Sequence, residues 1–302
     1  MIQSTYAISR LRVIATLVIV AFHCCCPYTK WYAVSHFPRL TETLAYVFDF
    51  LIYDRMLPTF FMLSGMLYFA KTDAVSSRLA VIWKKFDRLI IPYCMLVAFC
   101  VGLPSEVKTI GLGGIDGHGW FLLTLFILFF ISIVLNGRLH LRTLFFLALV
   151  MYVVGVAGFV KGYYALMVCR YFVFFVGGGI LNLFYERMKG SRLILASLTL
   201  MLVVLGLLGV RSLYSLVFNI TVFLWVSNKP IKSGWIKNLD SCSFGIYLTH
   251  HVVLFGLFSL YPIRFMYETN PWIALESMFP VVLMSSWLIV WVLKRKLGFK
   301  WI

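Results

Sequence analysis

Ten apolar runs, separated by short polar stretches, are the feature that most constrains how this chain can fold. A helix that crosses a bilayer needs about 20 mostly apolar residues, with some allowance for short or tilted helices. We therefore predict an all-α, polytopic integral membrane bundle of about ten transmembrane helices. The runs lie at residues 8–26, 44–69, 89–104, 119–136, 142–160, 163–185, 192–210, 212–227, 243–262 and 276–293.

Two parts of this division stay open. The run 89–104 is short, and only the segment from Gly209 to Ser212 separates the runs 192–210 and 212–227. If these runs join differently, the number of helices changes by one or two.

Composition supports a membrane protein. Hydrophobic residues make up 62% of the 302 residues and charged residues 13%, whereas soluble domains are about 45–50% apolar and about 25% charged. We find no low-complexity tract and no sign of a soluble domain. We therefore expect residues 1–302 to form a single transmembrane domain with no appended soluble domain.

The basic residues predict the orientation. The formal net charge is +16, from 27 lysines and arginines and 11 acidic residues. When the loops between ten spans are assigned to alternate sides, most of the basic residues fall on one side. The positive-inside rule then places both termini in the cytoplasm. Because the charge marks loops rather than one soluble face, we expect no nucleic acid partner.

Arg12 and His23 interrupt the first run, eleven positions apart. On a helix they would lie about 16 Å apart along the axis and about 20° from the same azimuth. Such groups are costly in hydrocarbon, so we expect them to face a polar path inside the bundle. With the N-terminus in the cytoplasm, Arg12 would lie near the inner end of the helix and His23 near its outer end.

The second run carries Asp49, Asp54 and Arg55. A charged carboxylate at the bilayer centre costs about 2.5 to 3.5 kcal/mol, so these groups should face partners or water. Asp49 has about the predicted depth of His23 and could hold the imidazole in one tautomer, as carboxylates do in catalytic triads. The alternative is that Asp54 and Arg55 satisfy groups on other helices.

The sixth run contains Arg170, followed by Gly177, Gly178 and Gly179. Arg170 needs an anion or carbonyl partner at its depth, and structural and ligand roles are equally open. The glycines lie in the middle of a predicted helix rather than at an N-terminus. Close helix packing therefore fits them better than phosphate binding does.

Further histidines lie at two sites. His118 belongs to a glycine-rich loop just before Trp120, where it could equally be a solvated loop residue, and His250 and His251 end the segment SFGIYLTHH. His250 lies within a predicted span and needs a partner. No spacing of the H-E-x-x-H type occurs, so we predict no metal. The seven cysteines show no C-x-x-C spacing, and we expect them to be small buried residues.

The segment from Lys71 to Arg88 is predicted to be a basic cytoplasmic loop. One interpretation is a topology determinant that contacts lipid headgroups. The other is a binding site for a phosphorylated cytoplasmic ligand, since arginine and lysine clusters match phosphates.

Taken in order, these segments resemble acyltransferase family 3, the bacterial multi-spanning membrane acyltransferases of the O-acetyltransferase type. Arg12 and His23 fit the family signature of an arginine, ten residues and a histidine. Other segments are similar to family patterns, and they occur in the family's order: Arg55, Pro58 and FFMLSG at 60–65; KKFDRLIIPY at 84–93; WFLLTL from 120; YFVFFVGGGIL from 171; and SFGIYLTHH from 243.

The resemblance implies a multi-pass protein of the cell inner (plasma) membrane. It would transfer an acyl group, commonly acetyl, from the cytoplasmic co-substrate acyl-CoA (acetyl-CoA) to a hydroxyl of an extracytoplasmic carbohydrate or glycoconjugate. Its expected partners are membrane lipids, the acceptor and acyl-CoA, and a homodimer is a candidate assembly. The alternative is a transporter or exporter of polysaccharide or lipid-linked sugar, but we see no repeat between the halves and no matching broken helices.

The same resemblance suggests a role for each polar residue. His23 would be the general base, and Asp49 or Asp54 would orient it. The phosphates of coenzyme A would contact basic residues at the cytoplasmic mouth, namely Arg10, Arg12, Arg78, Lys84, Lys85 and Arg88. The candidate substrate-binding residues are Arg55, His118, Trp120, Arg170 and His250. Trp120 could stack on a sugar ring.

Overall fold

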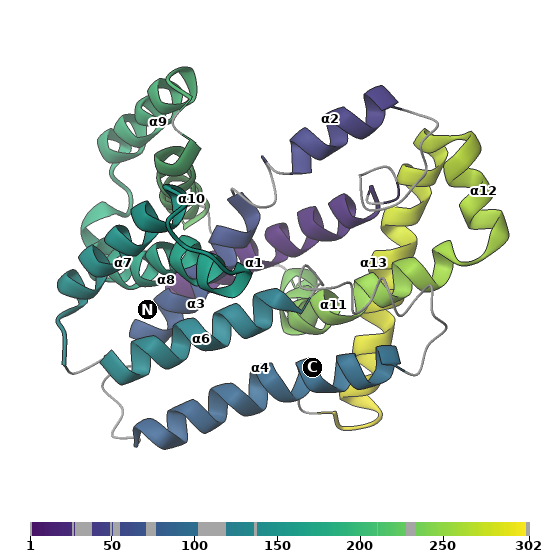
Figure 1. The fold of residues 1–302 in the computed structure, drawn as a ribbon, viewed down its shortest axis with the longest axis horizontal. Helices are drawn as coiled ribbons and strands as arrows, with labels where there is room; N and C mark the ends of the chain where they lie inside the picture. Colours follow the sequence, from purple (N-terminus) through teal and green to yellow (C-terminus); the bar gives the residue numbers. More distant parts are fainter. Residues whose placement is uncertain are drawn as a thin grey trace. The chain divides into compact units, whose positions relative to one another are not determined.

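The structure is a computed structural model that describes residues 2–25, 27, 38–48, 50, 55–70, 77–101, 119–135, 138–209, 211–227 and 234–299. These residues form helices and their connections, with no strand in the ranges described (Figure 1). The helices are α1 (Ile2–His23), α2 (Pro38–Phe48), α3 (Leu57–Phe69), α4 (Arg78–Val101), α6 (Trp120–Leu135), α7 (Leu141–Val156), α8 (Tyr163–Met188), α9 (Arg192–Leu207), α10 (Arg211–Ser227), α11 (Gly234–Phe258), α12 (Tyr261–Thr269) and α13 (Pro271–Arg295). The predicted site residues Asp49, Asp54 and His118 lie outside the described residues.

Several helices have the length and composition of membrane spans. Four described segments are long and apolar enough to cross a bilayer, namely Tyr6–His23 of α1 and the helices α8, α11 and α13. Shorter apolar helices are α3, α6, α7, α9 and the segment Leu213–Ser227 of α10. The all-helical membrane class is therefore supported, while the number of ten spans and the orientation of the termini stay predictions.

The structure changes the predicted boundaries in several places. The run 44–69 contains the end of α2 at Phe48 and the start of α3 at Leu57, where Pro58 suits the first turn of a helix. The predicted loop from Lys71 to Arg88 is wrong from Arg78 onward, because α4 begins there.

Local chemistry explains two of these helix ends. The hydroxyl of Ser77 accepts a hydrogen bond from the Ala80 N–H, which caps the first turn of α4. Gly209, with φ of +68°, ends α9 and keeps it separate from α10. Helix α12 was not predicted; it starts with a proline in its first turn and ends before Asn270.

The chain divides into two compact units. Unit 1 comprises Met1–Arg12, Leu57–Ile90 and Trp120–Lys232, and unit 2 comprises Val13–Met56, Ile91–Gly119 and Ser233–Ile302. The division falls within α1, whose first half belongs to unit 1 and whose second half belongs to unit 2.

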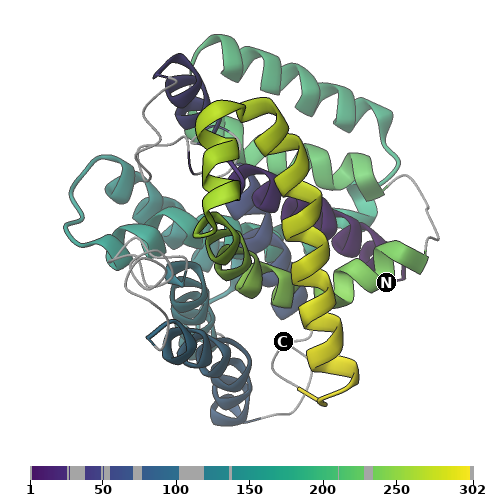
Figure 2. The same ribbon diagram turned by 90° about the vertical axis from the view of Figure 1, so that its right-hand side faces the viewer.

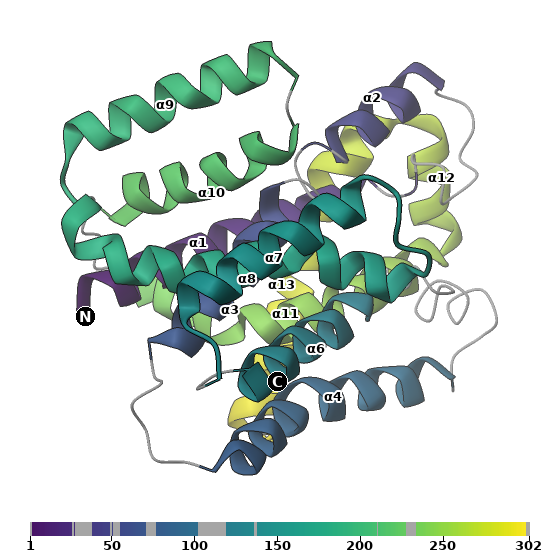
Figure 3. The same ribbon diagram turned by 60° about the vertical axis from the view of Figure 1, so that its left-hand side comes forward.

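Unit 1 is built on the close crossing of α3 and α8. A Cβ atom at Gly178 of α8 would overlap the carbonyl oxygen of Met62, and a Cβ atom at Gly65 of α3 would overlap the carbonyl oxygen of Phe175. Each helix therefore uses a glycine to let the backbone of the other approach. The predicted packing role holds for Gly178. In the same unit, α9 and α10 lie side by side (Figure 3).

Unit 2 is built on the contact between α11 and α13, with the yellow helix α13 beside the green helix α11 in Figure 2. The end of α1 and helix α12 complete its apolar core. The fully buried members of this core are Val20, Cys24, Cys242, Ile246, Leu254, Phe255, Tyr267, Ala274, Met278, Val282 and Val290. Cys24 and Cys242 are small core residues as predicted, whereas Cys94 is exposed.

The glycine crossing gives a matched test. Gly178→Ala should lower the thermal unfolding temperature of the purified protein in detergent, because overpacking of this kind costs about 1 to 3 kcal/mol. Gly177→Ala is the control, since its Cβ would meet Phe145 at an ordinary 3.5 Å. Equal unfolding temperatures for the two variants would contradict the close backbone contact.

Candidate active site

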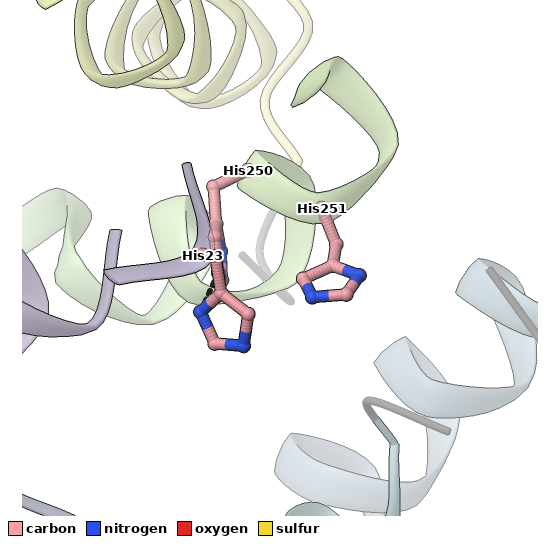
Figure 4. Close-up of side chains that lie close together, drawn as sticks. All are labelled: His23, His250 and His251. Atoms are coloured by element: carbon pink, nitrogen blue, oxygen red, sulfur yellow. Dashed lines mark hydrogen bonds between the residues drawn. The ribbon is translucent and has the colours of Figure 1, made fainter. Parts of the chain in front are cut away.

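Three histidines meet within unit 2. His23 is the last residue of α1 and is half-buried, while His250 and His251 of α11 are 0% and 5% exposed. The ring of His23 lies with its centroid 4.9 Å from that of His250 and 4.5 Å from that of His251. We call these three residues the histidine cluster (Figure 4).

The core of unit 2 fixes the end of α1 beside α11. Val20 and Cys24 pack in this core, one turn apart, on either side of His23. The hydroxyl of Tyr267 in α12 donates a hydrogen bond of 2.9 Å to the carbonyl oxygen of Cys24. This bond satisfies one of the carbonyl groups that a helix leaves without a partner at its C-terminus. The position of His23 is therefore set by residues far along the chain.

Backbone carbonyls select the tautomers of two of these histidines. Nδ1 of His23 lies 2.8 Å from the carbonyl oxygen of Ile19, and Nδ1 of His250 lies 2.9 Å from that of Ile246. A carbonyl oxygen only accepts hydrogen bonds, so each Nδ1 donates its proton. The lone pair of a neutral imidazole is then on Nε2. His23 can consequently take up a proton at Nε2.

The two histidines also contact each other directly. Nε2 of His250 lies 3.2 Å from Nδ1 of His23, and the dashed line in Figure 4 marks this pair. The ring of His251 meets His23 edge to face and packs against Phe255 at 5.1 Å. The sequence singled out His23 and His250 separately but did not predict that they meet.

The cluster also has the residue types of a metal site. One ring nitrogen of each histidine can be chosen so that all three lie within 4.8 Å of one another. Imidazole is a common ligand of zinc and other transition metals. The expectation of no metal came from local spacing, which says nothing of ligands that are far apart in the sequence. It therefore stays a prediction.

Arg55 is a buried cation of unit 2. It is 2% exposed, and its Nη1 donates to the carbonyl oxygen of Phe50. Its guanidinium also lies 3.2 Å from the centroid of the Phe50 ring. Through these contacts Arg55 satisfies a carbonyl group and packs on a ring of its own segment, which is a structural role.

Two other predicted site residues lie in unit 1. Trp120 starts α6, is 6% exposed, and stacks on Tyr171 with 5.8 Å between the ring centroids. Arg170 lies beside Tyr171 in α8 and is half-buried. Trp120 therefore belongs to the aromatic core of this unit, and its role as a sugar platform stays a prediction.

The six basic residues that were predicted to bind coenzyme A all belong to unit 1. Arg78, Lys84 and Arg88 are exposed on α4, and the Lys85 ammonium lies 3.7 Å from the centroid of the Phe129 ring. Arg12 is half-buried in α1. These residues come from α1 and α4.

Arg10 is the most buried of the six, at 7% exposure. Its Nη1 donates to the carbonyl oxygen of Val226 at 3.2 Å, whereas its Nε and Nη2 are buried without a hydrogen-bond partner among the described residues. A buried guanidinium without partners for its donors is costly, and a bound anion would reduce that cost.

Comparison with known families identifies the class of protein. The family model described as an acyltransferase domain, acyltransferase family 3, matches residues 5–291, nearly the whole chain. The chain belongs to this family. Comparison with curated proteins and with solved structures gave no match. The family identifies the protein as a membrane acyltransferase, and the histidine cluster is its candidate active site.

The bond from Tyr267 to Cys24 can be tested in this acyltransferase. Tyr267→Phe removes one buried hydrogen bond, which is worth about 1 kcal/mol, and should lower the unfolding temperature by a few degrees. Tyr261→Phe is the control, because Tyr261 is 75% exposed in the same helix. If both variants unfold at the parent temperature, the hydroxyl of Tyr267 does not hold the end of α1.

Proposed function

We propose that this protein is an acyl-CoA-dependent O-acyltransferase of the cell inner membrane, with both termini in the cytoplasm. It would move an acyl group, with acetyl as the first candidate, from cytoplasmic acyl-CoA to a hydroxyl of an extracytoplasmic carbohydrate or glycoconjugate. The observation that carries the proposal is the 2.8 Å contact between Nδ1 of His23 and the carbonyl oxygen of Ile19, which assigns the proton to Nδ1 and the basic lone pair to Nε2. Membership in the acyltransferase family suggests that this base acts in acyl transfer.

The proposed step is general base catalysis of thioester alcoholysis. The acceptor hydroxyl oxygen attacks the thioester carbonyl carbon while Nε2 of His23 takes the hydroxyl proton. The tetrahedral intermediate then collapses, the carbon–sulfur bond breaks, and the thiolate of coenzyme A recovers the proton from the imidazolium. The products are the O-acyl ester and the free thiol, and His23 returns to its neutral form.

The proposed donor site uses the cations of unit 1. Lys84 and Arg88 are exposed one turn apart on α4, where they share a face that phosphate groups of coenzyme A could contact. Arg10 and Arg12 would add charge at the cytoplasmic end of α1, as would Arg78 and Lys85 on α4. The buried donors of Arg10 support an anion partner for this group.

The roles of the remaining predicted residues are part of the proposal. Asp49, Asp54 and His118 lie outside the described residues, and their suggested roles toward the base and the acceptor rest on the sequence. Arg55, Trp120 and Arg170 are proposed to contact the acceptor or to support the walls around it, and their packing contacts favour the supporting role.

The base can be tested with vesicles, radiolabelled acetyl-CoA and candidate glycans. His23→Gln should reduce transfer of label to glycan by about 10² to 10⁴-fold, the range typical of a lost general base. Cys25→Ala is the control, since it changes a neighbouring side chain at the same helix end. Transfer at the parent rate by a well-folded His23→Gln protein would refute the assignment of the base. Movement of glycan across the membrane without acylation would instead support the exporter.

The donor site can be tested by steady-state kinetics. The double variant Lys84→Gln/Arg88→Gln should raise KM for acetyl-CoA about tenfold and leave kcat nearly unchanged, since phosphate contacts far from the thioester contribute uniform binding. Arg138→Gln/Arg142→Gln is the matched control, because it removes two exposed charges that are also predicted to be cytoplasmic. A KM unchanged in the first variant would exclude these two residues from donor binding.

A further inference from the structure

We propose that His250 is the residue that positions His23 for base catalysis, by accepting a hydrogen bond from Nδ1–H of His23. This inference rests on the proposed function, in which His23 is the base. It assigns to an imidazole on α11 the role that the sequence suggested for Asp49 or Asp54, and it makes His250 a positioning residue rather than a substrate ligand.

The first step is to assign the ring nitrogen of His250 that carries the proton. Its Nδ1 lies 2.9 Å from the carbonyl oxygen of Ile246, one turn earlier in α11, and therefore carries the proton. The side chain is 0% exposed, so water does not compete for this bond. The Nε2 atom of neutral His250 is consequently an acceptor.

The second step is the direction of the bond between the two rings. Nε2 of His250 is 3.2 Å from Nδ1 of His23, and Nδ1 of His23 also lies 2.8 Å from the carbonyl oxygen of Ile19. Both neighbours are acceptors, so a proton on Nδ1 of His23 is shared between them and held there. The lone pair is thereby fixed on Nε2 of His23, where the acceptor hydroxyl would be deprotonated.

The third step concerns the charge that develops during transfer. When His23 becomes an imidazolium, its Nδ1–H becomes a stronger donor, and Nε2 of His250 can stabilise it. A neutral imidazole stabilises this charge less than a carboxylate does, but its own burial costs far less. We therefore expect a smaller effect on rate than the roughly 10⁴-fold loss seen when a triad aspartate is replaced.

The same geometry argues against a metal ion as the main occupant of the histidine cluster. A ring nitrogen must offer its lone pair to bind a metal, and Nδ1 of His23 is engaged as a donor to Ile19. The lone pair on Nε2 of His250 is directed at this Nδ1–H, at 3.2 Å, and is therefore not available to a metal ion. Direct contact between the rings favours a shared proton over a shared metal ion.

The test compares substitutions at residue 250 in the full-length protein. His250→Leu removes the acceptor and should lower kcat on the order of 10 to 100-fold without raising KM for acetyl-CoA. His250→Gln offers an amide oxygen to Nδ1–H of His23 and should recover most of the lost kcat. Thr249→Val is the control, because the Thr249 hydroxyl donates to the carbonyl oxygen of Gly245 in its own helix, and it should match the parent.

Each contrary outcome has a distinct meaning. If His250→Leu elutes and unfolds like the parent and keeps its kcat while His23→Gln is inactive, His250 has no positioning role and the proposed function stands. If His23→Gln is also fully active, the proposed function itself fails. Equal losses in the Leu and Gln variants, together with stoichiometric zinc in purified parent protein by elemental analysis, would replace the shared proton with a metal site.

A second readout does not need activity. The unfolding temperatures of His23→Leu, His250→Leu and the double variant should be non-additive, because both single changes break the same hydrogen bond. Additive shifts would show that the two rings are not coupled and would overturn the inference.

Discussion

Polar groups removed from water need partners inside the protein, and this constraint shapes several described parts of the molecule that bear on function. It acts on the histidine cluster, where two rings use carbonyl groups of their own helices. It acts on Arg55, which turns back to Phe50. It acts within unit 1 as well, where Thr59 of α3 donates to the Asn219 side chain of α10. In each case the partner is local backbone or a neighbouring helix.

The fold class could be predicted from the sequence because apolar length is a direct requirement of a bilayer. Five of the ten predicted runs, those at α6 through α10, correspond to described helices with similar limits, while the runs at α1, α11 and α13 begin later than the helices do. The boundaries failed where hydropathy does not determine helix ends. Helix α4 extends into the basic segment because Ser77 caps it, and α12 forms because a proline starts a short helix.

The candidate site could be predicted only in part. Signature spacing singled out His23, and the need of a buried polar residue for a partner singled out His250. Their meeting could not be predicted, because it depends on how Val20, Cys24 and Tyr267 pack the end of α1 against α11. The predicted carboxylate partners Asp49 and Asp54 lie outside the described residues, and their role stays a prediction.

The use of main-chain oxygens to select tautomers has a consequence for how this site could change over time. A carboxylate that orients a histidine is lost by a single codon change, but the carbonyl groups of Ile19 and Ile246 are present whichever side chain occupies those positions. The tautomers of His23 and His250 thus depend on the path of two helices as well as on the two side chains. Other apolar residues of similar size at positions 19 and 246 would keep this selection, whereas a bulge or kink there would reassign the protons.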